Sequence, residues 1–92
     1  MKIKMVFVYD AQLNEDGVGA YMDEDETFGV AVWRVCRALG MRLDEWSFFF
    51  GPYEVYGTGR PLGRGKYRTP RDFGMDEEDE VEILCVPLPA QN

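Results

Sequence analysis

The sequence has 92 residues, of which 46% are hydrophobic and 29% are charged, and this balance is typical of one globular domain with a modest core. It contains no histidine, which excludes Ser-His and Cys-His catalytic pairs, and its two cysteines do not have zinc-finger spacing. We therefore expect no enzyme activity, no cofactor and no metal.

The net charge of −7 is unevenly distributed along the chain. Residues 51–71 carry a local balance of +4, and the remaining residues carry −11. An acidic body favours a protein partner with a basic surface over nucleic acid. No signal peptide or membrane-length apolar stretch is visible, and both cysteines lie in apolar segments, where thiols behave as small hydrophobes. We therefore expect no membrane association and an intracellular location, nuclear or cytoplasmic.

The N-terminal third of the chain predicts two strands. Residues 1–9 alternate with a period of two, which indicates a strand. The polar residues 13–19 predict a turn, and residues 18–22 predict a short second strand. In the first strand, one face would carry Ile3, Met5, Phe7 and Tyr9, and the other Lys2, Lys4, Val6 and Val8.

A helix is predicted after Thr27, because apolar residues recur there at spacings of three and four. Thr27 is a suitable N-cap and Gly40 a suitable C-terminal stop. The acidic run 23–26 has two interpretations, either carboxylates that favour the positive end of the helix or a site for a partner. The apolar stripe of the helix comprises Phe28, Ala31, Val32, Val35, Cys36 and Leu39.

Residues 46–50 alternate again and predict a strand, and residues 51–68 then form the most glycine-rich part of the chain. This segment holds five glycines and two prolines and predicts a long basic loop inserted into the domain. It could grip a nucleic-acid backbone with its tyrosines stacking on bases, touch the acidic body of a second copy, or be a plain flexible loop.

The C-terminal part predicts a short turn of helix over 69–74, an acidic turn over 76–80 and a last alternating strand over 81–86. Pro87 and Pro89 would end that strand, because proline cannot donate to the ladder. The overall order is typical of an α+β domain with one main helix on a mixed sheet of four or five strands.

In residues 28–40, 46–50 and 69–82 the chain resembles the SUMO family of ubiquitin-like β-grasp domains. Phe28, Cys36 and Gly40 match leucine, cysteine and glycine of the family's helix, and residues 46–50 resemble its Leu-Arg-Phe-Leu-Phe strand. The most specific match is 69–82, Thr-Pro-Arg-Asp-Phe-Gly-Met-Asp-Glu-Glu-Asp-Glu-Val-Glu. SUMO-like domains of genome-maintenance scaffold proteins share this block. The resemblance implies a β-grasp fold and noncovalent binding, through the acidic turn, to the back of a SUMO-conjugating enzyme.

The chain departs from the family at three places. No glycine follows Gly74, so a C-terminal Gly-Gly is absent and we expect no conjugation through the C-terminus. The segment 51–68 is longer than its counterpart in the family. In the groove that holds acid-flanked hydrophobic motifs, the family's basic positions are Tyr21, Asp23, Val30 and Ala38 here, so we do not expect this groove to favour acidic peptides.

The outer face of the predicted sheet, together with the acidic turn, is the main candidate site. If alternate residues face the helix, the opposite face shows apolar side chains on neighbouring strands, and a contiguous apolar patch usually marks an interface. The long loop could instead cover this patch, and the acidic turn could simply be solvated. The predicted partner-binding residues are Val6, Val8, Phe49, Asp76, Glu77, Glu78, Asp79, Glu82 and Leu84, with Val86 beside them.

Secondary candidates lie on the helix, the second strand and the loop. Trp33 is off the apolar stripe, so it is either a surface hot spot or partly buried against the edge of the second strand. The full secondary set is Trp33, Tyr21, Met22, Arg60, Arg64, Lys66 and Arg68.

The sequence thus predicts a SUMO-like adaptor domain over residues 1–92 that binds proteins noncovalently. The expected partner has a basic surface, such as a SUMO-type conjugating enzyme or a scaffold complex. Two alternatives stay open: a nucleic-acid-binding module acting through residues 57–68, and an assembly domain that forms a homodimer through its outer sheet.

Overall fold

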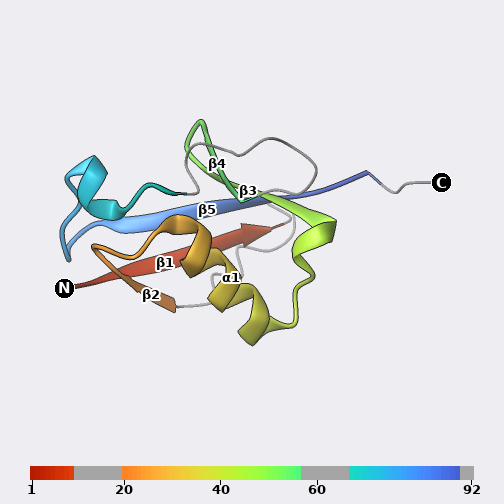
Figure 1. Cartoon of the computed structure of the whole chain (residues 1–92), viewed down its shortest axis with the longest axis horizontal. Helices are drawn as coiled ribbons and strands as arrows, with labels where there is room; N and C mark the ends of the chain where they lie inside the picture. Colours follow the sequence, from red (N-terminus) through yellow and green to blue (C-terminus); the bar gives the residue numbers. More distant parts are fainter. Residues whose placement is uncertain (10–19, 57–66, 90–92) are drawn as a thin grey trace.

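The computed structural model describes residues 1–9, 20–56 and 67–89. Within these ranges, five strands form one mixed sheet in the order β2-β1-β5-β3-β4, and one α-helix crosses a face of it (Figure 1). This is the predicted α+β arrangement of a β-grasp fold. The elements are β1 (Lys2–Tyr9), β2 (Ala20–Asp23), α1 (Phe28–Leu39), the 3-10 helix η1 (Leu43–Glu45), β3 (Trp46–Phe50), β4 (Tyr53–Tyr56), the 3-10 helix η3 (Pro70–Phe73) and β5 (Glu80–Pro87).

The last strand, β5, lies in the middle of the sheet. It pairs parallel with β1 and antiparallel with β3, while β2 and β4 form antiparallel edges on β1 and β3. Parallel pairing requires a long crossover connection. Here the chain from residue 10 to residue 79 forms this connection between β1 and β5. None of the helices in the described part of the chain is long and apolar enough to cross a membrane.

Helix α1 begins and ends at the predicted residues. The Thr27 hydroxyl accepts a hydrogen bond from the Val30 N–H at 3.4 Å. Gly40 adopts φ 73°, a left-handed conformation that glycine takes without steric cost, and its N–H donates to the Cys36 carbonyl. The predicted stripe is buried from Phe28 to Cys36, and Leu39 packs at its margin.

The prediction of a loop over all of 51–68 is wrong at its start. Gly51, with φ 57°, turns the chain so that β4 pairs antiparallel with β3. Tyr53, Val55 and Tyr56 are strand formers, but the glycines further along dominate the composition of the segment. Most of the remainder of the predicted loop, 57–66, lies outside the described residues, as do the predicted turn 13–19 and the first residues of the predicted second strand.

The core lies between α1 and the inner face of the sheet. Alternate residues of β1 and β5 are fully or almost fully buried there, together with Phe48, Met22 and Val55 from the other strands. Phe28 of α1 stacks on Phe50 with ring centroids 4.9 Å apart, and Phe73 of η3 packs edge-on against both rings. This aromatic cluster, defined as Phe28, Phe50 and Phe73, joins the helix, the sheet and η3.

We expect Phe28→Ala to lower the free energy of unfolding by about 3–5 kcal/mol, because it removes a fully buried ring and leaves a cavity. The measurement is urea unfolding followed by circular dichroism. Val30→Ala on the same helix is the control, since Val30 is 55% exposed, and it should change stability by less than about 0.5 kcal/mol. Equal stability of the two variants would contradict the role given to the aromatic cluster.

Candidate interaction surfaces

The outer face of the sheet carries a partly exposed apolar patch. Buried and exposed side chains alternate along β5. Leu84 is 44% exposed and Val86 is 39% exposed, whereas Ile83 and Cys85 belong to the core. Leu84 lies opposite Val8 of β1 and opposite Phe49 of β3, and both neighbours are half-buried. The structure therefore brings the predicted apolar residues together. We call this patch the sheet-side surface: Val6, Val8, Phe49, Leu84 and Val86.

Acidic side chains border the sheet-side surface at the start of β5. Glu82 is opposite Val6, and Glu80 is opposite Lys4, whose positive charge offsets part of the local negative charge. Both glutamates are exposed. The acidic turn leads directly into this strand, so the negative charge lies next to the apolar patch.

The four residues of the acidic turn divide into two roles. The Asp79 carboxylate accepts from the Asp76 N–H at 2.8 Å, and the Asp76 carboxylate accepts from the Glu78 N–H at 2.9 Å. These two aspartates hold the shape of the turn. The side chains of Glu77 and Glu78 are exposed and make no hydrogen bond or ion pair with the described residues, so they are the members of the turn available to a partner.

The acidic run 23–26 is bound by arginines. Arg71 contacts Asp25 at 2.7 Å and Glu24 at 3.2 Å, and Arg34 contacts Glu26 at 2.9 Å. The hydrogen bond from Arg71 lowers the pKa of the Asp25 carboxyl, and the same contact raises the pKa of Arg71. The first turn of α1 itself contains no acidic residue. The carboxylates of Glu24, Asp25 and Glu26 instead form ion pairs with arginines of η3 and α1.

Three of these carboxylates lie close enough together to be considered for a metal ion. One oxygen each from Asp23, Glu24 and Asp25 lies within 4.8 Å of the others. Arg71 already neutralises two of the three. The arrangement is therefore explained by ion pairing.

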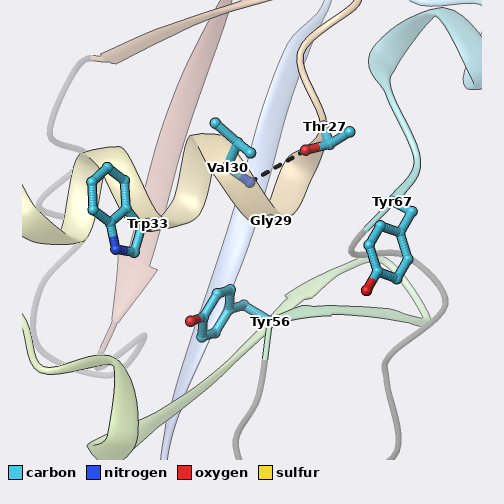
Figure 2. Close-up of a pocket in the computed structure, with 6 residues that line it drawn as sticks. All are labelled: Thr27, Gly29, Val30, Trp33, Tyr56 and Tyr67. Atoms are coloured by element: carbon cyan, nitrogen blue, oxygen red, sulfur yellow. Dashed lines mark hydrogen bonds between the residues drawn. The ribbon is translucent and has the colours of Figure 1, made fainter.

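A pocket of about 260 Å³ opens between α1 and β4. Figure 2 shows Trp33 and Tyr67 on opposite sides of it, with Tyr56 of β4 between them. The Arg37 guanidinium lies 5.3 Å from the centre of the Trp33 ring, a cation–π contact. The residues that line the pocket are Thr27, Gly29, Val30, Trp33, Tyr56 and Tyr67.

The secondary candidates Trp33, Tyr21 and Met22 lie in different places, and Trp33 does not pack against the second strand as one interpretation had it. Trp33 faces β4, whereas Arg34 faces β2 and donates to the Tyr21 carbonyl at 2.8 Å. Met22 is fully buried, because it lies opposite Ile3 on the core face of the sheet. Tyr21 is 56% exposed but lies on the outer face, opposite Lys4.

Of the residues that line the pocket, only Trp33 was among the predicted site residues, although the sequence carries a signal for Val30 as well. Val30 and Trp33 are spaced by three and both lie off the buried stripe, so a second apolar face of the helix could have been recognised. Tyr56 could not have been found, because β4 was not predicted. Arg60, Arg64 and Lys66 lie outside the described residues, and no observation on the described Arg68 favours nucleic acid.

The two cysteines are buried between α1 and the sheet, Cys36 on the helix and Cys85 on β5. Burial raises the pKa of the Cys36 thiol to about 11, and burial together with the neighbouring Cys36 raises that of Cys85 to about 12. Thiols at such pKa values are almost wholly protonated near neutral pH, and the thiolate is the reactive form. They are therefore structural members of the core.

We expect neither thiol to react with Ellman's reagent in the native protein at pH 8, and both to react once guanidinium unfolds the chain. The measurement is the absorbance of the released thionitrobenzoate, with glutathione as the control for an accessible thiol. A native protein that reacts as fast as glutathione would show that the cysteines are open to solvent.

Comparisons with known proteins identify the fold. No family sequence profile matches the chain, and no curated protein matches it. Among solved structures, it is similar to the UBL domain of yeast Ddi1, with a TM-score of 0.56 and 10% identity over 100% of this chain and 93% of that chain. It is also similar to Caldiarchaeum subterraneum ubiquitin, with a TM-score of 0.61 and 17% identity over 100% of this chain and 98% of that chain.

The chain therefore has a ubiquitin-like β-grasp fold, and the predicted fold is confirmed. Neither of these two neighbours is a SUMO protein, so the similarity to SUMO itself stays a prediction.

Proposed function

We propose that this domain is a noncovalent, non-enzymatic adaptor of SUMO-like type, which binds a basic protein through the sheet-side surface. The observation that carries the proposal is the half-exposed Leu84, which lies between Val8 and Phe49 and close to acidic side chains. An apolar centre with a polar rim is the usual anatomy of a protein interface. Such a centre supplies most of the affinity.

The acidic rim would select the partner. Glu77, Glu78 and Glu82 are exposed and have no cationic partner among the described residues, so their charge is available to a basic surface. Charges at a rim mainly set the association rate and the orientation of the partner. The resemblance of residues 69–82 to the SUMO family makes the back of a SUMO-type conjugating enzyme the partner to test.

We expect Leu84→Ala or Phe49→Ala to weaken binding of a SUMO-type conjugating enzyme by about 1–3 kcal/mol, because each removes part of the apolar centre. Isothermal titration calorimetry measures the affinity. Val30→Ala is the matched control, since it truncates an exposed apolar residue on the opposite side of the domain. If the control and both test variants bind as wild type does, the sheet-side surface is not the interface.

Reversing the charge of the acidic turn should change the rate at which the partner associates. With Glu77→Lys and Glu78→Lys combined, association should slow and its dependence on salt should flatten, because two rim charges no longer attract the basic partner. Stopped-flow measurement at several salt concentrations tests this, with circular dichroism to verify the fold. An unchanged association rate and salt dependence would remove the acidic turn from the interface.

A further inference from the structure

The domain has a second exposed apolar surface, on the side of the sheet that α1 covers. Val30 is 55% exposed, Trp33 46% and Tyr67 62%, and all three line the pocket between α1 and β4 (Figure 2). We call these three residues, together with Arg37 and Arg68, the helix-side surface. Its apolar centre is comparable in exposure to that of the sheet-side surface, but its charges have the opposite sign.

The arginines explain this difference in charge. Among the described residues, Arg34, Arg42 and Arg71 each pair with a carboxylate, whereas Arg37 and Arg68 pair with none. Each of these two adjoins a residue that lines the pocket, Arg37 through its contact with Trp33 and Arg68 as the sequence neighbour of Tyr67. Arg37 lies over Trp33, and Arg68 follows Tyr67 at the start of α1, where its carbonyl accepts the Phe28 N–H at 2.9 Å.

We propose that the helix-side surface of one copy of this chain docks on the sheet-side surface of a second copy, head to tail. The inference rests on the proposed function, because it uses the same sheet-side surface and identifies a partner for it. Val30 and Trp33 would pack on Leu84 and Val86. Arg37 and Arg68, which pair with no carboxylate among the described residues, would meet Glu77, Glu78 and Glu82.

Charge selects this pairing from the three ways in which two copies could cover their apolar surfaces. Two sheet-side surfaces placed together would bring two acidic rims into one interface, where Lys4 on the outer face offsets only part of the negative charge. Two helix-side surfaces placed together would bring Arg37 and Arg68 of both copies into one interface. Like charges in contact are costly at an interface, and the mixed pairing instead joins the acidic rim to the arginines. A helix layer on a sheet layer is also a standard packing arrangement.

The chain's overall charge of −7 opposes association at long range. At physiological salt, however, charges more than about 8 Å apart are largely screened. Contacts at the interface therefore decide the outcome, and we expect a weak association that depends on concentration. A heterologous interface leaves one surface of each kind unused in every dimer, so further copies can add to both ends.

The test uses two variants that each block one surface. The first combines Trp33→Ala with Arg37→Glu on the helix side, and the second combines Leu84→Ala, Glu77→Lys and Glu78→Lys on the sheet side. Wild type should increase in mass with concentration in sedimentation velocity at physiological salt. Each variant alone should stay monomeric, while an equal mixture should form a dimer that grows no further, because it retains one intact pair of surfaces.

Arg42→Glu is the matched control, since it makes the same charge change at an exposed arginine outside both surfaces and should associate as wild type does. Circular dichroism verifies that all variants fold. A wild type that stays monomeric, or a mixture that stays monomeric where wild type associates, overturns the proposal. A dimer formed by either variant alone overturns it in favour of a symmetric interface.

The two proposals can fail separately. If the chain does not self-associate but Leu84→Ala weakens binding of the conjugating enzyme, head-to-tail docking is wrong and the adaptor function stands. If the mixture dimerises but no conjugating enzyme binds, the domain is an assembly module and the SUMO-type partner is wrong.

Discussion

The pairing of β5 between β1 and β3 is the constraint on which the rest of the structure depends. Because side chains alternate along a strand, β5 buries Val81, Ile83 and Cys85 against α1 and presents Glu82, Leu84 and Val86 on the outer face. One register therefore fixes both the core and the candidate interface. A slip by a single residue would exchange the two sets.

Much of the fold could be predicted because its signals are local. The periods of the strands and of α1, the Thr27 cap and the Gly40 stop are each encoded within a few residues, and the structure has them where they were expected. The second edge strand, β4, was missed because its four residues follow a turn and precede a glycine-rich stretch. Its stability comes from pairing with β3, which composition does not reveal.

The surfaces were harder to predict because they depend on tertiary placement. Periodicity locates Trp33 outside the buried stripe, but which flank of the helix faces β4 depends on the direction in which α1 crosses the sheet. Likewise, Arg71 and Asp25 are 46 residues apart, so no local pattern shows that the acidic run is already neutralised. Short β2 offers too few residues for alternation to show that Met22 belongs to the core.

The parallel pairing of β1 with β5 has a consequence for synthesis of the protein on the ribosome. Ile3, Met5 and Phe7 are synthesised well before β5, the strand that completes their side of the sheet and ends at residue 87. Contacts so distant in sequence form slowly, since a long loop must close before they stabilise anything. A nascent chain must therefore keep an unpaired apolar strand edge in solution throughout elongation, the kind of edge that invites aggregation and that chaperones protect.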